Sequence, residues 1–150
     1  MSEAILIPVE EWGGDAIHFL YQLLAERPPE ANISHKAMPS LTQHEAFCAS
    51  RPYEGWWLIV LRGAQEGGEK RSFFRQPVGA CYITKMGEIG IQIARGHQRE
   101  GYARTALNAL IAMHPGRRLL ANIAPGNEPS RRLFEGFGFK LIQHTFELER

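Results

Sequence analysis

The sequence predicts an α/β fold in which helices cover both faces of a mixed β-sheet. In some segments apolar residues recur at three- and four-residue intervals, and in others they alternate with polar residues, so both helices and strands are expected. The expected order is strand, two helices, three strands, helix, strand, helix, strand. Consecutive strands combined with alternating units are typical of a mixed sheet. The chain of 150 residues is long enough for one domain with a buried core, so we expect a single domain over residues 1–150.

The amino-terminal third is expected to contain one strand and two helices. Residues 4–9 form a short apolar run typical of a strand, and the next segment has the apolar face of a helix. That helix has to end near Arg27, because prolines occupy the next two positions. Ser40 followed three residues later by Gln43 is a capping box, so a second helix should begin there after a loop at 28–39.

The middle of the chain is expected to form three consecutive strands. Residues 56–62 read as a buried strand, and the glycine-rich, charged segment 63–76 is expected to be a long hairpin connection. The next strands are expected at 77–85 and 87–94, joined by a tight turn. In the second of these, isoleucine alternates with glutamate, glycine and glutamine, which is the pattern of a strand with one buried face.

The carboxyl-terminal third is expected to alternate between helices and strands. A strongly periodic helix is predicted from Gly101 to Met113, and a strand at 117–124 follows. Asn127 is predicted to cap a short helix, because its side chain can accept a hydrogen bond from the first helical turn. Residues 137–148 are expected to form a terminal strand.

The segment HQREGYAR, residues 97–104, lies between a predicted strand and the first turn of the predicted helix. The free N–H groups and the dipole of a helix's first turn favour an anion, and a glycine lets a ligand approach the backbone closely. Basic residues cluster locally in the sequence, as in Arg95, Arg99 and Arg104 and then Arg117 and Arg118. Since the formal net charge is only +1, this local cluster favours a small polyanion over nucleic acid or a membrane surface.

The composition is that of a globular protein, with 44% hydrophobic and 22% charged residues. No apolar stretch approaches the roughly 18 residues of a membrane span, and the amino terminus does not have the pattern of a signal peptide. The two cysteines, Cys48 and Cys81, do not have metal-ligand spacing and are expected to be reduced packing residues. We therefore expect a cytoplasmic protein with no metal site.

At the turn before the periodic helix, the sequence resembles the GCN5-related N-acetyltransferases, the GNAT family. That family has Gln or Arg, two residues of any type, Gly, any residue, and then Gly or Ala at this place, and residues 98–103, QREGYA, match. The family's closing helix and strand are similar to Asn127, Ser130, Leu133, Phe134 and the GFGF run at 136–139. The resemblance implies a central, mostly antiparallel sheet that is splayed between two parallel strands.

The resemblance also implies that acetyl-CoA is the acetyl donor and binds where the strands at 87–94 and 118–124 separate. Its pantetheine arm would pair with the edge of the first strand, as an added strand would, and its pyrophosphate would lie on the backbone of the turn. The implied cofactor-binding residues are Ile91, Ile93, Ala94, Gln98, Arg99, Glu100, Gly101, Tyr102, Ala103, Arg104, Asn127, Ser130 and Phe134.

In this family an amine attacks the thioester carbonyl directly, so the protein has to accept a proton, polarise the carbonyl and assist the leaving thiolate. Many members place a tyrosine acid on the last helix, but the matching residue here is Phe134, which has no proton to give. Ser130, one helical turn earlier, is the candidate that could assist the thiolate instead. Glu88 is the first candidate for the base, acting through water, and His35 and His44 are the second choice.

The acceptor amine is not identified by the sequence, although the loop and second helix form the acceptor side in this family. His35, His44 and Trp57 are the candidates for acceptor binding. The leading hypothesis is an acetyl-CoA-dependent N-acetyltransferase that acts on a primary amine in a ternary complex, with another acyl-CoA as an alternative donor. The alternative is a CoA-binding regulatory module with little or no turnover. Homodimers are frequent in the family, and the terminal strand is the candidate contact.

Overall fold

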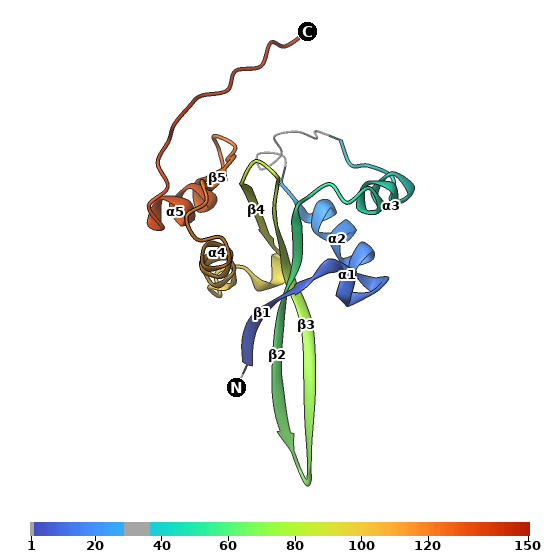
Figure 1. Ribbon diagram of the computed structural model, residues 1–150. Helices are drawn as coiled ribbons and strands as arrows, with labels where there is room; N and C mark the ends of the chain where they lie inside the picture. The colour runs from blue at the N-terminus through green and yellow to red at the C-terminus, as the bar shows by residue number, and fades with distance from the viewer. Residues whose placement is uncertain (1, 29–36) are drawn as a thin grey trace.

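The computed structural model describes residues 2–28 and 37–150 and contains a five-stranded sheet with the strand order β1-β2-β3-β4-β5 (Figure 1). The strands are β1 (Ser2–Pro8), β2 (Gly55–Gly67), β3 (Lys70–Ile83), β4 (Glu88–Ile93) and β5 (Leu120–Ala121). The helices are α1 (Val9–Trp12), α2 (Asp15–Glu26), α3 (Leu41–Ala49), α4 (Tyr102–Met113) and α5 (Glu128–Gly136). The predicted α/β class with a mixed sheet is confirmed.

The sheet is antiparallel from β1 to β4, and only its last pair is parallel. Two residue pairs join β4 to β5, Glu88 with Leu120 and Ile89 with Ala121. Beyond these pairs the two strands are no longer hydrogen-bonded to each other, so they separate towards the carboxyl end of β4. This is the splayed parallel pair that the family resemblance implies.

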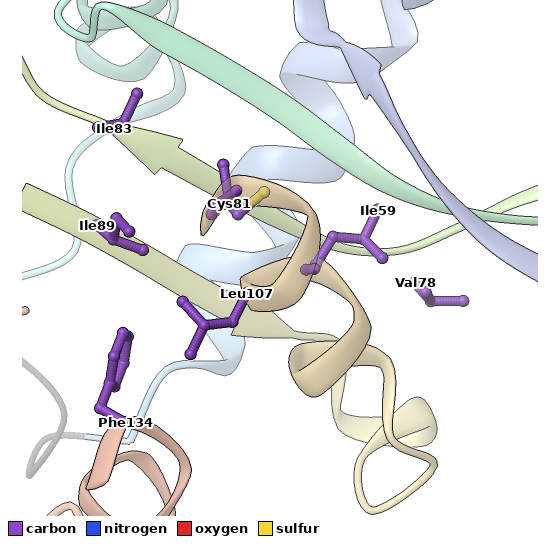
Figure 2. Close-up of a cluster of buried hydrophobic side chains, with 9 residues drawn as sticks. Ile59, Val78, Cys81, Ile83, Ile89, Leu107 and Phe134 are labelled. Atoms are coloured by element: carbon purple, nitrogen blue, oxygen red, sulfur yellow. The ribbon is translucent and has the colours of Figure 1, made fainter. Parts of the chain in front are cut away.

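Strand alternation divides the buried side chains between two apolar cores, one on each face of the sheet. One face packs against α4 and α5, and its core includes Ile59, Val78, Cys81, Ile83, Ile89, Leu107, Leu110 and Phe134 (Figure 2). The other face packs against α2, and its core includes Ile7, Ala16, Leu20, Leu23, Leu58, Val60, Ala80 and Ala94. Full burial of one such aliphatic side chain contributes about 1.5–3 kcal/mol, so the two cores strongly favour this strand register.

The helix boundaries predicted from capping residues are confirmed. The Ser40 hydroxyl accepts a hydrogen bond from the Gln43 N–H at 3.1 Å, and the Gln43 side chain accepts one from the Ser40 N–H at 2.9 Å. Asn127 caps α5 by accepting from the Ser130 N–H at 3.3 Å. Helix α2 ends at Glu26, two residues before the prolines. None of the described helices is long and apolar enough to cross a membrane.

The prediction for segment 63–76 is wrong in its main feature, because most of the segment is strand. Strands β2 and β3 stay paired out to Gly67 and Lys70 and are connected by a tight turn at Gly68 and Glu69. Gly68 has a φ of +62°, a conformation that glycine adopts at no steric cost. The paired strands form a long hairpin that projects from the body of the protein (Figure 1).

Two further strand predictions, at 117–124 and at 137–148, are wrong in extent or existence. The first segment contributes only Leu120–Ala121 to the sheet, and residues 139–150 contain neither helix nor strand and extend away from the body (Figure 1). Alternation predicts which side chains would share a face, but a strand also needs a neighbouring edge to pair with. Within the described chain, residues 139–150 do not pair with any strand of the sheet.

Candidate active site

The separation of β4 from β5 leaves part of the β4 edge without a strand partner. The Ala94 N–H donates to the Val78 carbonyl of β3 at 2.8 Å. Because backbone groups alternate between the two edges of a strand, those of Ile91 and Ile93 point away from β3, towards the side where β5 diverges. An extended ligand can pair with such an edge as an additional strand would.

The chain leaves β4 through a 3₁₀ turn at Arg95–His97 and enters α4 at Gly101. Gly101 is the N-cap residue, with a φ of +83°, and no side chain caps the helix. A Cβ placed on Gly101 would meet no atom within 4 Å, so the space before the first turn is open. Uncapped N–H groups, the helix dipole and open space are together what a bound phosphate requires.

The basic residues around this turn have different environments. Arg95 is tied to the end of α2, since its N–H donates to a Glu26 carboxylate oxygen at 2.9 Å and its guanidinium contacts the Glu26 carbonyl at 3.3 Å. Arg99 is exposed and has a φ of +65°, which is uncommon for a residue other than glycine. The Arg104 guanidinium lies 5.2 Å from the centroid of the Phe137 ring. Arg99 and Arg104 are therefore the two cations nearest in sequence to the uncapped turn that are not tied to α2.

The other predicted residues of this turn are polar, small or half-buried. The Gln98 amide lies 3.4 Å from the Ile93 carbonyl oxygen, and the Tyr102 ring lies 6.4 Å from that of His97. Glu100 is exposed and Ala103 is half-buried. The motif recognised in the sequence thus forms one continuous loop from the end of β4 to the start of α4.

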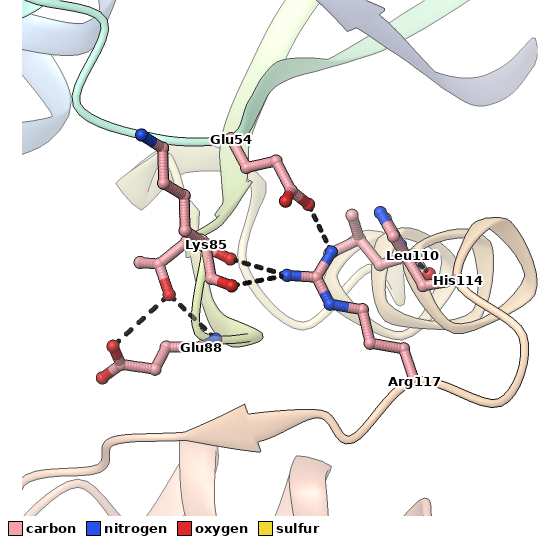
Figure 3. A network of polar contacts seen from close by, with 7 residues as sticks. Glu54, Lys85, Glu88, Leu110, His114 and Arg117 are labelled. Carbon is pink, nitrogen blue, oxygen red and sulfur yellow. Dashed lines mark hydrogen bonds and ion pairs between the residues drawn. The ribbon is translucent and has the colours of Figure 1, made fainter.

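Glu88 lies at the start of β4, where β5 is still paired with it. Its carboxylate accepts hydrogen bonds from the Thr84 hydroxyl at 3.3 Å and from the side-chain amide of Asn122. The Arg117 guanidinium donates to the carbonyl oxygens of Thr84 at 3.2 Å and Lys85 at 3.0 Å, so it braces the same turn (Figure 3). The carboxylate is held beside the point at which the two parallel strands separate. Thr84 and Asn122 are not among the site residues predicted from the sequence.

On the face covered by α2 and α3, a small cleft that is open to solvent reaches β4. Four aromatic residues form much of its wall, namely Phe47, Tyr53, Trp56 and Tyr82. The rings of Tyr53 and Tyr82 are stacked with centroids 3.9 Å apart, and Trp56 meets Tyr53 edge-on at 4.9 Å. Gly90 of β4 also lines the cleft, so a molecule bound here would lie beside the strand with the open edge.

The three residues predicted to bind the acceptor fall in different places. His44 lines the cleft and is only 2% exposed. Trp57 packs on the opposite face of the sheet, against the core beneath α4, and Trp56 is the tryptophan that lines the cleft. Adjacent residues of a strand point to opposite faces, so only one of the pair can lie in the cleft. His35 lies outside the described residues.

Helix α5 carries the two residues that the family resemblance places near the sulfur. Phe134 is 3% exposed and belongs to the core that contains Ile89 (Figure 2). Its ring lies edge-on to that of Phe139, with centroids 5.1 Å apart. Ser130 is half-buried, one turn earlier, and its N–H donates to the Asn127 cap. The helix therefore anchors its aromatic residue in the core and carries Ser130 in its first turn.

The cleft contains residues that sequence reasoning missed or did not place, among them Arg27, Phe47 and Tyr82. No spacing could have found them, because the cleft is assembled from distant segments of the chain. Burial raises the pKa values of Tyr53 and Tyr82. Both phenols therefore stay protonated at neutral pH and can donate hydrogen bonds, but they do not supply a base there.

Replacing Gly90 by alanine is expected to displace Tyr82 and change the cleft. An added Cβ would overlap the Tyr82 ring, which has to move out of its stack with Tyr53. The lost aromatic pair should cost about 1 kcal/mol of folding free energy. The near-ultraviolet circular dichroism should change, whereas it should not change in Gly14→Ala, where an added Cβ meets no atom within 4 Å. Identical spectra for Gly90→Ala and the unmodified protein would contradict this arrangement of the cleft.

Comparison with known proteins supports this description of the fold. A family model for the acetyltransferase (GNAT) domain matches residues 7–140. None of the curated proteins matches the chain. A solved domain from Methanocaldococcus jannaschii DSM 2661 has a TM-score of 0.72 at 18% identity, over 98% of this chain and 94% of that chain.

Two solved structures of N-acetyltransferases are also similar in fold. The enzyme from Staphylococcus aureus Mu50 has a TM-score of 0.62 at 18% identity, over 93% of this chain and 84% of that chain. A point mutant of the spermidine N-acetyltransferase from Vibrio cholerae has a TM-score of 0.54 at 18% identity, over 89% of this chain and 78% of that chain. At 18% identity these structures show similarity of fold alone. The family model covers most of the sequence and therefore identifies the family. The chain belongs to the GNAT acetyltransferase family.

Proposed function

We propose that this protein is an acetyl-CoA-dependent N-acetyltransferase that acts on a primary amine. Membership of the family supports acetyl transfer. The observation that supports acetyl-CoA as the donor is the open edge of β4, which is followed closely by the uncapped first turn of α4. An extended pantetheine arm needs the first feature and a pyrophosphate needs the second.

The described residues fit acetyl-CoA. Ile91 and Ile93 offer backbone groups to an amide-containing arm, and the open space at Gly101 leaves room for phosphate oxygens. Arg99 and Arg104 would add positive charge next to them. When bound, acetyl-CoA would supply the acetyl group as an activated thioester.

The chain's own groups are proposed to act on the amine, the carbonyl and the thiolate. The Ile93 N–H is the better candidate for polarising the carbonyl, because the Ala94 N–H already donates to β3. Glu88 is proposed to accept the amine proton through water, with the Nδ1 atom of His44 as the alternative acceptor. The Ser130 hydroxyl is proposed to hydrogen-bond the departing sulfur.

Calorimetric titration with acetyl-CoA, CoA and pantetheine, which lacks the pyrophosphate, tests the donor site. We expect saturable one-to-one binding that weakens when the pyrophosphate is lost, and no binding at millimolar ligand would overturn the proposal. CoA release with a panel of amines then tests turnover. Because Phe134 lacks the family's usual hydroxyl, a CoA-binding module with little turnover is the second candidate function. That candidate predicts affinity for CoA without acceleration of acetyl transfer.

Phe134→Tyr is expected to raise the turnover number about tenfold, which is less than the roughly 100-fold lower end of general-acid catalysis, because a CoA thiolate is a tolerable leaving group without an acid. The change restores the acid that the family resemblance implies at this position. The rate of CoA release measures the effect, and Phe139→Tyr is the matched control, because it adds the same hydroxyl to the neighbouring ring. An equal rate in Phe134→Tyr and the unmodified protein would mean that departure of the thiolate does not limit turnover.

We also propose that the protein forms a homodimer through residues 139–150. These residues expose four large apolar side chains, and within the described chain the sheet ends at β5. The side chains are Leu141, Ile142, Phe146 and Leu148, which are between 62% and 91% exposed. A second copy could cover them by strand pairing at that edge, since unpaired strand edges and exposed apolar surface both favour association.

The double substitution Leu141→Ser with Phe146→Ser is expected to convert this dimer into a monomer. The apolar surface that drives association would be lost, while the folded body, which does not bury these side chains, would keep its stability. Light scattering coupled to size-exclusion chromatography measures the mass. The control is Lys140→Ser with Gln143→Ser, two exposed polar positions in the same segment. A monomeric unmodified protein would contradict the proposal.

A further inference from the structure

Among the described residues, one side chain with a fixed charge lines the cleft beside β4. Of the described residues that line it, only Arg27 has a permanently charged side chain, and most of the others are aromatic or aliphatic. The side-chain amide of Gln92 is already used, because it donates to the Leu23 carbonyl. A half-buried cation among aromatic rings is costly to desolvate unless a counter-ion accompanies it.

Arg27 is positioned by the end of α2. Its N–H donates to the Leu24 carbonyl at 3.2 Å and closes the helix, which leaves the guanidinium free to reach the cleft. Burial raises the pKa values of Tyr53 and Tyr82, and the positive charge of Arg27 opposes this shift at both phenols. Arg27 lines the same cleft as both stacked rings.

No carboxylate of the described residues forms an ion pair with Arg27. The nearest acid in the sequence, Glu26, accepts from the Arg95 N–H at 2.9 Å and from the Gln22 amide at 3.2 Å, so it is engaged elsewhere. A single guanidinium matches one carboxylate in charge and in its two-pronged geometry. A phosphate dianion would bring a second negative charge that no other cation among the described residues lining the cleft could neutralise.

His44 also lines the cleft, and its side chain has one unsatisfied nitrogen atom. Its Nε2 atom lies 3.1 Å from the Ile17 carbonyl oxygen, which can only accept, so Nε2 carries the hydrogen and Nδ1 carries a lone pair. Nδ1 is buried and has no hydrogen-bond partner among the described residues. A buried acceptor without a partner costs about 1–3 kcal/mol, and a ligand N–H could satisfy it.

We propose that the acceptor is an aromatic or apolar amine that also carries a carboxylate, and that Arg27 selects it. The guanidinium pairs with the carboxylate, the aromatic wall packs on the body of the molecule, and an N–H of the ligand donates to Nδ1 of His44. The amine then lies towards Gly90 and the open edge of β4. The same charge at Arg27 opposes a polyamine such as spermidine. The inference rests on the proposed acetyl transfer, which gives the bound amine its reaction.

The first test measures binding without the donor. The probes are 3-phenylpropanoate and its neutral counterpart 3-phenylpropanamide, and nuclear magnetic resonance titration of the tryptophan side chains gives their dissociation constants. The carboxylate is expected to bind about tenfold more tightly than the amide, because a charged hydrogen bond is stronger than a neutral one. Arg27→Gln should remove the preference, and Arg27→Lys should keep part of it. Equal binding of the two probes to the unmodified protein would overturn the proposal.

The second test measures turnover with matched amines, L-phenylalanine against L-phenylalaninamide and L-tryptophan against L-tryptophanamide. We expect kcat/KM to favour the carboxylates about tenfold, and Arg27→Gln to remove this preference through KM, with kcat and acetyl-CoA affinity unchanged. Arg62→Gln is the control, because it removes an exposed cation that pairs with Glu3 on the hairpin side of the molecule. A preference that persists in Arg27→Gln would overturn the proposal.

The two tests give different outcomes for this inference and for the proposed function. If Arg27 only stabilises the end of α2, Arg27→Gln lowers the melting temperature and leaves the carboxylate preference intact, which overturns the inference. Failure of the protein to bind acetyl-CoA would overturn the proposed function but would leave the binding test of the cleft valid. Carboxylate preference together with acetyl-CoA binding would support both.

Discussion

Gly101→Val is expected to weaken acetyl-CoA binding about 100-fold. The valine side chain would enter the open space in front of the first turn of α4, where the pyrophosphate is proposed to lie. Loss of two charge-assisted hydrogen bonds to backbone N–H groups costs about 3 kcal/mol, which corresponds to this change in the dissociation constant. Calorimetric titration of acetyl-CoA measures it directly.

The substitution also strains the backbone, and its control has to share that strain. Gly101 has a φ of +83°, which a β-branched residue adopts at a cost of about 1–3 kcal/mol. Gly116, just beyond the other end of α4, has a φ of +73° and equally open surroundings. Gly116→Val should therefore lose similar stability and still bind acetyl-CoA. Similar affinities for the two variants would show that the phosphates do not lie at Gly101.

The parts of the fold that were predictable from sequence depend on residues close together in the chain. Ser40 and Gln43 form a reciprocal capping box at the start of α3, and Asn127 caps α5. The residue types at these positions were therefore enough to predict where both helices begin. The extent of β5 and the absence of a strand at 137–148 depend on which edges are available for pairing. That information is tertiary, so alternation alone led to strands that the structure does not contain.

The candidate site also has a part that depends on residues close together in the chain and a part that depends on distant residues. The strand edge and the turn proposed to hold the pantetheine and pyrophosphate are continuous from β4 through Gly101 into α4, so a local motif was enough to propose them. The cleft is assembled from separate elements, and Arg27, the single fixed cation among its described residues, follows a helix that has no spacing relationship to Tyr82 or Gly90. Alternation could show that Trp56 and Trp57 point to opposite faces, but not which face would form the cleft.

Phe134→Ala is expected to lower the free energy of unfolding by about 4 kcal/mol, among the largest effects of any single truncation in this chain. The ring is 3% exposed and packs in the core shared by β4, α4 and α5, so its loss leaves a cavity that the surrounding side chains fill only in part (Figure 2). Urea denaturation measures the change. Total stability is typically about 5–15 kcal/mol, so the variant should still fold at low temperature.

The same variant decides whether position 134 belongs to the core or to the donor site. Phe139, the edge-on partner of Phe134, is only half-buried, so Phe139→Ala should cost about half as much or less. A loss below about 1.5 kcal/mol in Phe134→Ala, with weaker acetyl-CoA binding, would mean that the ring contacts the donor instead of filling the core. The expected large loss would mean that this ring contributes substantially to holding α5 on the sheet. Ser130 would then depend on Phe134 for its position, and the residue that replaces the family's acid would serve to position the hydroxyl proposed to assist the thiolate.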